Sequence, residues 1–421
     1  MSGMKLKTLL LGAAAAATAT TAQAADLPVA PEPVDYVRIC DTYGSRFYYI
    51  PGTETCLRVG GRLRTQVIVN NVLDDGAWAD RDEDGYSWLS RGYVYLDSRT
   101  ATEFGTLRTY TSIYGTVTNG GNSVTLDNAY IQWGGLTAGY LGSNFNIYTG
   151  QVFMGVVTRD WADSTLNQLA YTAAFGDGFS ATIALEDRSG REVGDYGGTR
   201  APDLVGALGI SQGWGSAQLS GALHQVYPDA AFNSTNASGN EDNLGWAVGA
   251  GVNVNLPFAN SGSNIYFQGF YADGALSYVG NGITSITGTI NEALTEVTLD
   301  YDGDDPDVSV SDYGSNGSKN SGFSLSAGVY IQATPTIGLA VDGSYAHLEL
   351  SGIYSETTIG SVDADIDRWA IDGSVQWQPV SGFVLGADVG YSSASVDPSV
   401  ADIDVDDLNE LKFGVRMQRT F

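Results

Sequence analysis

The sequence predicts an all-β fold, a 16-stranded antiparallel transmembrane β-barrel with one loop folded into its interior. Segments of about ten residues alternate apolar and polar side chains along most of the 421-residue chain. Short turns alternate with long acidic loops between these segments, and the chain opens with an export signal. Beyond the N-terminus no apolar run approaches the roughly 18 residues of a membrane helix, which excludes a helical membrane protein.

The N-terminal region has two predicted parts. Residues 1–24 have the features of a secretory signal peptide, with Lys5 and Lys7 before an apolar stretch and a small-residue ending. Residues 25–56 are predicted to form a periplasmic N-terminal segment with a disulfide between Cys40 and Cys56. These are the only two cysteines, and the exported chain enters an oxidising compartment. The barrel is predicted over residues 57–421.

Sixteen strands are expected in one unbroken meander. The first three begin at Leu57, Ser87 and Thr106. The others are predicted near 124–134, 136–142, 167–176, 179–188, 203–212, 216–227, 243–256, 263–279, 320–333, 336–350, 367–378, 383–396 and 408–421. A soluble β-sandwich would also alternate, but it would need neither a signal peptide nor sixteen consecutive strands. The terminal Phe421 resembles the C-terminal signal by which outer-membrane barrels are recognised for insertion.

The loop predicted to fold inward covers about residues 142–168. It does not alternate, but groups seven apolar side chains between Phe145 and Trp161 and places Asp160 and Asp163 beside them. Loops in contact with water are normally polar, so this one is predicted to fold back into the barrel and narrow it. The alternative is an external loop packed against a partner subunit.

Basic residues are concentrated on four of the predicted strands. Nine of them lie there: Arg58, Arg62, Arg64, Arg91, Arg99, Arg108, Lys412, Arg416 and Arg419. In a closed barrel the last strand pairs with the first, so these strands are neighbours, and all but Arg419 occupy the polar register. A constriction with a transverse field is therefore predicted between two acids and a cationic wall, formed by Asp160, Asp163, Arg62, Arg64, Arg91, Arg99, Arg108 and Arg416. The alternative is that nearby carboxylates such as Asp97 pair with the arginines and hold the wall together.

The charge balance is strongly acidic, with 48 Asp and Glu against 20 Lys and Arg and a net charge of −28. Removal of residues 1–24, with two lysines and no acid, leaves a net charge of −30. This argues against a nucleic-acid partner. An acidic rim favours cations within a Debye length of about 8 Å, whereas the cationic wall opposes that preference.

Two alternating acidic sets are candidates for divalent-ion binding, because each would point to one face of an extended chain. They are Asp363, Asp365, Asp367 and Asp402, Asp404, Asp406. The alternative is a solvated acidic rim. No cofactor and no enzymatic activity are expected, since His224 and His347 are far apart in sequence and no residues mark a Ser–His pair.

Several long phrases resemble the general porins of alphaproteobacteria, of the rhizobial type. They are DYVRICDTYG, YYIPGTETCLRVGGRLR, LDSRTATEFGTLRTY, AYIQWGGLTAGYLGSNFNIYTG and AYTAAFGDGFSATIALEDR. The resemblance is dense from about Asp35 to Arg188, and it departs in the acidic loops 280–319 and 351–407. It implies a water-filled, homotrimeric channel in outer-membrane lipid, through which small hydrophilic solutes and ions diffuse.

A substrate-selective sugar channel is the alternative to such a general porin. Four tyrosines on the same predicted strands as the arginines could form a stacking track for sugars: Tyr93, Tyr95, Tyr110 and Tyr114. The same aromatic side chains could equally support the neighbouring arginines.

Overall fold

The computed structural model describes residues 38–73, 76–81, 83–228, 243–257, 260–290, 296–301, 308–314, 317–353, 362–399 and 404–421. The predicted signal peptide (1–24) and residues 25–37 of the predicted N-terminal segment lie outside these ranges. Among the described residues, no helix has both the length and the apolar character that crossing a membrane requires.

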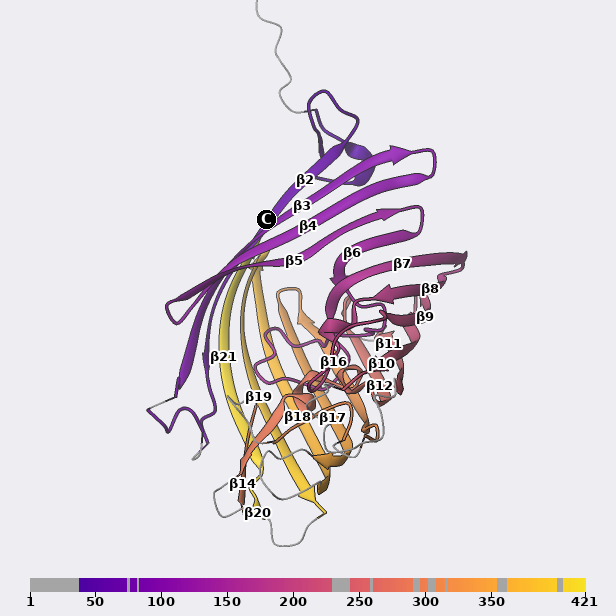
Figure 1. The fold of residues 1–421 in the computed structure, drawn as a ribbon. Coiled ribbons are helices and arrows are strands. Elements are labelled where there is room, and N and C mark those ends of the chain that lie inside the picture. Colours follow the sequence, from indigo (N-terminus) through magenta and orange to yellow (C-terminus); the bar gives the residue numbers. More distant parts are fainter. Residues whose placement is uncertain are drawn as a thin grey trace, which may run out of the picture.

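Sixteen antiparallel strands close into a barrel (Figure 1), as predicted. They are β2 (Cys56–Val69), β3 (Tyr86–Thr102), β4 (Gly105–Thr118), β5 (Gly121–Trp133), β6 (Leu136–Gly142), β7 (Thr165–Gly176), β8 (Phe179–Glu186), β9 (Asp203–Gln212), β10 (Gly215–Val226), β11 (Asn243–Asn255), β12 (Asn264–Asp273), β16 (Ser321–Thr334), β17 (Ile337–Ile353), β18 (Val362–Val380), β19 (Phe383–Pro398) and β21 (Leu408–Thr420). Each pairs with the next, and β21 pairs with β2 from Arg62↔Thr420 to Val69↔Phe413. Closure leaves no free sheet edge, which is the condition for a sheet to cross lipid.

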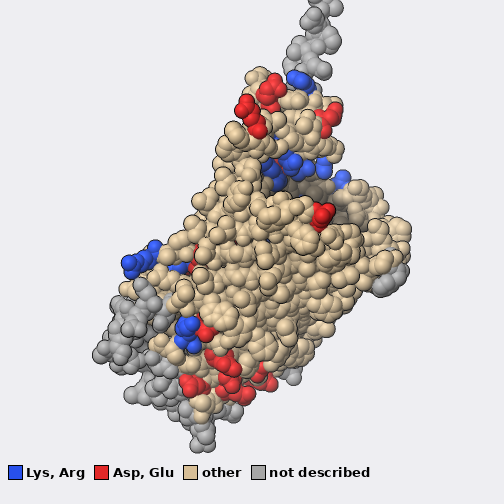
Figure 2. All heavy atoms as spheres, turned by 90° about the vertical axis from the view of Figure 1, so that its right-hand side faces the viewer, with Lys and Arg blue, Asp and Glu red and all other residues tan. Residues whose placement is uncertain are grey.

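The apolar half of each alternating pattern faces outward. On β2, for example, Val59 and Leu63 are 48% and 59% exposed, whereas Gln66 on the other register is buried. Figure 2 shows a broad central band with few charged side chains on the face in view, and acidic side chains towards both ends. An apolar outer band between charged ends is the surface that a bilayer requires.

The two ends of the barrel differ in their connections. At the turn end, short links such as Gly134-Gly135 and Asp177-Gly178 join the strands, and the chain finishes there at Phe421. The opposite, loop end carries the longer connections. One link at the loop end is short, because Asn119 and Gly120 both take positive φ and form a two-residue hairpin turn between β4 and β5.

The predicted strand over 263–279 is too long. β12 ends at Asp273, Gly274 adopts a left-handed φ of 65°, and the chain turns into a 3₁₀ turn, η4 (Leu276–Tyr278), and a short helix, α2 (Asn281–Thr284). The apolar residues that continued the alternation are instead buried beside Phe145 and Phe270.

Within the predicted acidic loops, four short strands form a second sheet: β13 (Ile286–Ile290), β14 (Glu296–Tyr301), β15 (Val308–Ser309) and β20 (Asp404–Val405).

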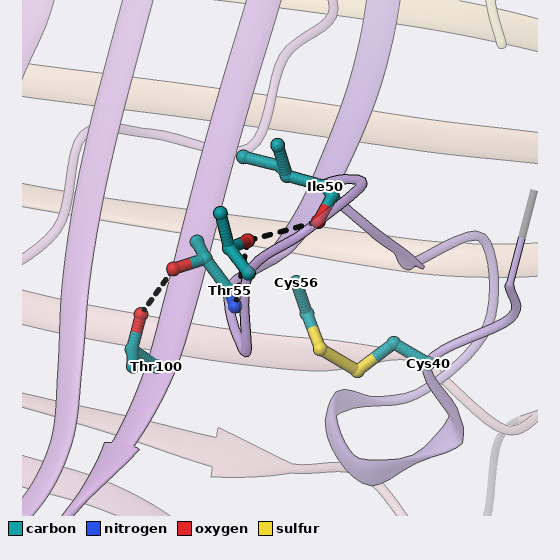
Figure 3. Close-up of a disulfide and its surroundings, with 6 residues drawn as sticks. Cys40, Ile50, Thr55, Cys56 and Thr100 are labelled. Carbon is teal, nitrogen blue, oxygen red and sulfur yellow. Dashed lines mark hydrogen bonds between the residues drawn. A yellow bond between two sulfur atoms is a disulfide. The ribbon is translucent and has the colours of Figure 1, made fainter.

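The N-terminal segment lies at the turn end and contains η1 (Asp41–Tyr43) and β1 (Tyr48–Tyr49). The predicted Cys40–Cys56 disulfide is confirmed and joins this segment to the first residue of β2 (Figure 3). The hydroxyl of Thr55 also contacts that of Thr100 on β3, with 2.9 Å between the oxygens. The disulfide therefore fastens a small appendage to the rim of a barrel that is already closed by its own strands.

Replacement of both Cys40 and Cys56 by Ser is expected to leave single-channel conductance nearly unchanged. Loss of the cross-link should destabilise the appendage by about 3 kcal/mol in the chain-entropy model, without affecting the strand ladders. Limited proteolysis should then cleave residues 38–55 faster, while bilayer recordings remain like those of the wild type. A large change of conductance would instead show that this segment reaches into the pore.

Candidate functional site: the lining of the barrel

The loop between β6 and β7 lies inside the barrel, as its apolar composition predicted. Its backbone N–H groups bind three buried aspartates that project inward from adjacent strands: Asp342 of β17, Asp372 of β18 and Asp388 of β19. Each carboxylate accepts hydrogen bonds from two consecutive N–H groups. The pairs are Gln151 and Val152 on Asp342 (2.6 and 2.8 Å), Met154 and Gly155 on Asp388 (2.6 and 3.1 Å), and Val156 and Val157 on Asp372 (2.7 and 3.4 Å). We call these three residues the aspartate anchor.

Glycines on the inner wall let this loop approach closely. A Cβ atom at Gly386 would lie 2.4 Å from the Phe153 ring, and one at Gly390 would lie 2.7 Å from Val157. A Cβ at Gly414 on β21 would lie 2.5 Å from Met154. The apolar side chains of the loop therefore fill hollows in the wall, and Val157 and Trp161 are buried as a result.

The predicted position of Asp160 needs correction. Its side chain is fully buried and does not face the cationic wall. One oxygen pairs with Arg368 of β18 at 2.5 Å, and the other accepts the Ile283 N–H at 2.7 Å. Arg368 is itself 1% exposed and also donates to the Thr158 carbonyl. Asp160 is therefore half of a buried ion pair that fixes the loop to the wall and to α2.

Asp163, the other predicted acid of the constriction, is exposed, and none of the ion pairs in the described part of the chain involves its carboxylate. Its backbone carbonyl accepts a hydrogen bond from the Asn281 side chain at 3.2 Å. The two acids that the sequence grouped together therefore differ: Asp160 is buried in an ion pair, whereas the Asp163 carboxylate is exposed and forms no ion pair within the described ranges.

Three arginines of the cationic wall share one carboxylate. Asp97 is 1% exposed and contacts Arg99 at 2.8 Å, Arg108 at 3.1 Å and Arg58 at 3.5 Å. Here the structure matches the alternative in which arginines pair with Asp97. Because Phe47 lies against Arg58 and Arg99, this group belongs to the turn end, next to the N-terminal segment.

Four other arginines on the same wall have no carboxylate within ion-pair distance among the described residues: Arg62, Arg64, Arg91 and Arg416. They contact neutral groups instead. Arg62 lies 3.9 Å over the Tyr93 ring, and Arg91 lies 4.3 Å over Tyr114 and donates to Thr116. Arg416 donates to Gln66 and to the carbonyl of Phe153 on the inward loop. We call these four residues the free arginine cluster.

In the first acidic set, Asp363 and Asp365 are exposed at the loop end of β18 and alternate with the buried Ala364 and Ile366, whereas Asp367 is half-buried and contacts His347 at 3.0 Å. In the second set, Asp402 and the side chain of Asp404 lie outside the described residues, and Asp406 is exposed. Within the described ranges, no group of three or more His, Cys, Asp or Glu side chains is placed to hold a metal ion.

The turned-in segment after β12 is held by a buried polar network. Tyr278 donates to Asp203 at 2.6 Å, and His224 contacts the same carboxylate at 2.9 Å. Asp312 accepts the N–H of Leu276, and complete burial raises the pKa of this carboxyl while the neighbouring His224 opposes that shift. This packing holds the segment against β9, β10 and β12, whereas the free arginine cluster lies on β2, β3 and β21.

Sequence reasoning missed the aspartate anchor and Arg368. A signal for them exists, because Asp342, Arg368, Asp372 and Asp388 are charged residues at inward register positions of predicted strands. A charged side chain on the inner face must contact water, an oppositely charged partner or the backbone of a loop. The alternation alone does not show which of these three it meets.

A closed membrane barrel with a polar lining and a loop anchored inside it defines an outer-membrane channel protein. The chain belongs to the porin family described as "Porin subfamily", whose model matches residues 26–412. It is 41% identical over 241 residues to porin Omp2b of Brucella suis and 40% identical over 241 residues to porin Omp2b of Brucella melitensis. Each match covers 51% of this chain and 64% of the relative.

Among solved structures, the fold resembles the outer membrane channel DcaP of Acinetobacter baumannii. The TM-score is 0.61 with 14% sequence identity, over 89% of this chain and 99% of that one. This likeness supports the fold alone. Together, the family and the closed barrel place the protein in the bacterial outer membrane, as predicted.

Proposed function

We propose that this protein is a general porin, a water-filled channel for passive diffusion of small hydrophilic solutes and ions across the outer membrane. The observation that carries the proposal is the inward loop, which is bound to one side of the barrel wall by the aspartate anchor. A loop held against the wall narrows the lumen without plugging it. The other side of the lumen is lined by arginine and tyrosine side chains of β2, β3 and β4.

The proposal extends to assembly and export. The predicted signal peptide supplies the route to the periplasm, and the apolar outer band suits both lipid and neighbouring subunits. We propose a homotrimer on the basis of family membership. Native mass spectrometry in mild detergent should show three chains together, and a spectrum of monomers only would count against this.

The charge distribution suggests different environments along the pore. Exposed acids such as Asp363 and Asp406 lie at the loop end, whereas the free arginine cluster lies deeper on the wall. The acidic mouth would favour cations, as predicted from the composition, while the interior would favour anions. Passage of neutral solutes should depend mainly on their size.

A graded series of neutral sugars in a liposome-swelling assay tests the general porin. The swelling rate should fall smoothly with sugar size, because a wide aqueous pore discriminates neutral solutes by friction and exclusion. Saturable uptake of one sugar would support the selective channel instead. In that channel Tyr93 and Tyr114, whose ring centroids lie 4.9 Å apart, would bind the sugar.

A further inference from the structure

The free arginine cluster brings like charges together without compensation. Arg64 of β2 lies directly across from Arg91 of β3 in the strand register, and Arg62 lies across from Tyr93. Like charges directly opposite each other on a sheet destabilise it. On β21, Arg416 pairs in register with Gln66, two residues beyond Arg64, and so extends the same cationic surface.

The guanidinium groups of this cluster are held in position by aromatic rings, but some of their N–H donors have no hydrogen-bond acceptor among the described residues. Arg62 and Arg64 both lie near the Tyr93 ring, at 3.9 and 5.9 Å, and Arg91 donates to the Tyr93 hydroxyl at 3.4 Å. The Nε atoms of Arg62 and Arg64 are shielded from solvent and have no hydrogen-bond acceptor among the described residues. The aromatic rings thus hold several planar donor groups close together, and within the described ranges none of these groups forms an ion pair with a carboxylate.

The wall itself provides a comparison. Around Asp97, three arginines converge on one buried carboxylate and their charge is partly neutralised. Among the described residues, no carboxylate lies within ion-pair distance of the free arginine cluster. Asp160 is paired with Arg368, and the aspartate anchor binds loop N–H groups, with Asp342 and Asp372 also contacting Arg159. An external anion would neutralise the charge of these arginines, as the Asp97 carboxylate does for Arg58, Arg99 and Arg108.

We propose that Arg62, Arg64 and Arg91, with Arg416 beside them, form a binding station for multivalent oxyanions inside the pore. Guanidinium groups match the oxygens of phosphate and carboxylate by paired hydrogen bonds, and such charge-assisted bonds are stronger than neutral ones. The ligand class is therefore small phosphorylated or multiply carboxylated solutes. The inference rests on the proposed function to the extent that the lumen is an open aqueous path to these side chains.

Inorganic phosphate and pyrophosphate are suitable probes. Purified full-length protein in detergent is titrated by calorimetry, and single-channel current in KCl is recorded with either probe added at constant ionic strength. Binding should be saturable, tighter for pyrophosphate than for phosphate, and accompanied by a saturable reduction of current. The variant R64Q should weaken pyrophosphate binding about tenfold, since one charge-assisted hydrogen bond is worth roughly that factor.

The matched control is R419Q on β21, because Arg419 occupies the outward register and donates to the Ser381 carbonyl. It should bind pyrophosphate like the wild type. The proposed oxyanion site would be refuted if wild type and R64Q bound pyrophosphate equally well. It would also be refuted if the heat signals were no larger than those of sodium acetate. Absence of conductance in plain KCl would instead contradict the proposed porin function. Calorimetry would still test oxyanion binding independently of that result.

Discussion

Neutralising two members of the aspartate anchor should change the single-channel current from a steady level to one that fluctuates. In the double variant Asp372→Asn and Asp388→Asn, four loop N–H groups lose their carboxylate acceptors, and Arg159 loses its closer partner at 3.4 Å. Hydrogen bonds to charged groups contribute roughly 1.5–3 kcal/mol each to stability. A loss of about 4 kcal/mol corresponds to about a thousandfold rise in the population of released loops.

The readout is single-channel current together with limited proteolysis. A released loop moves into the lumen, so the current should fluctuate between levels, and cleavage should appear within residues 143–164. The barrel should remain heat-resistant, because its strand ladders are untouched. Asp397→Asn is the control, since Asp397 also lies on β19 but is exposed at its end. A steady current and unchanged proteolysis in the double variant would contradict the anchoring role.

The strands were predictable because lipid imposes a strict rule on them. Outward positions must be apolar, so the alternation appears in the sequence itself, and β6 (Leu136–Gly142) was predicted with its observed bounds. The disulfide was predictable because only one pairing is available. The error at 263–279 has a different origin. The pattern in Ala272–Val279 is compatible with a strand, and only the left-handed Gly274 and the buried site beside Phe145 end it.

The site was less predictable, because its contacts join residues far apart in the chain. Composition showed that the loop should be buried, but not against which part of the wall. Asp160 and Arg368 are 208 positions apart, and their contact depends on the path of the loop across the barrel. The predicted opposition of Asp160 to the arginines assumed that a loop acid next to apolar residues faces the lumen. The structure shows that such an acid can lie beneath the loop and bind the wall.

Asp160 and Asp163 should therefore respond differently to the same substitution. Asp160→Asn removes the charge that compensates the buried Arg368, and breaking a buried pair from one side typically costs about 3–5 kcal/mol. Hydrogen exchange in residues 158–163 and 280–284 should accelerate about a hundredfold or more, since Asp160 joins these two segments. The double variant Asp160→Asn and Arg368→Gln should recover part of the protection, because no uncompensated charge remains buried.

Asp163→Asn should leave that protection intact and instead shift the reversal potential in a KCl gradient toward anions. Its carboxylate is exposed on the loop, so its removal changes the field in the pore rather than the packing. The exposed Asp406 at the loop end serves as the control. Asp406→Asn should give a smaller shift that fades in high salt. Equal shifts from Asp163→Asn and Asp406→Asn would show that Asp163 lies away from the narrow part of the pore.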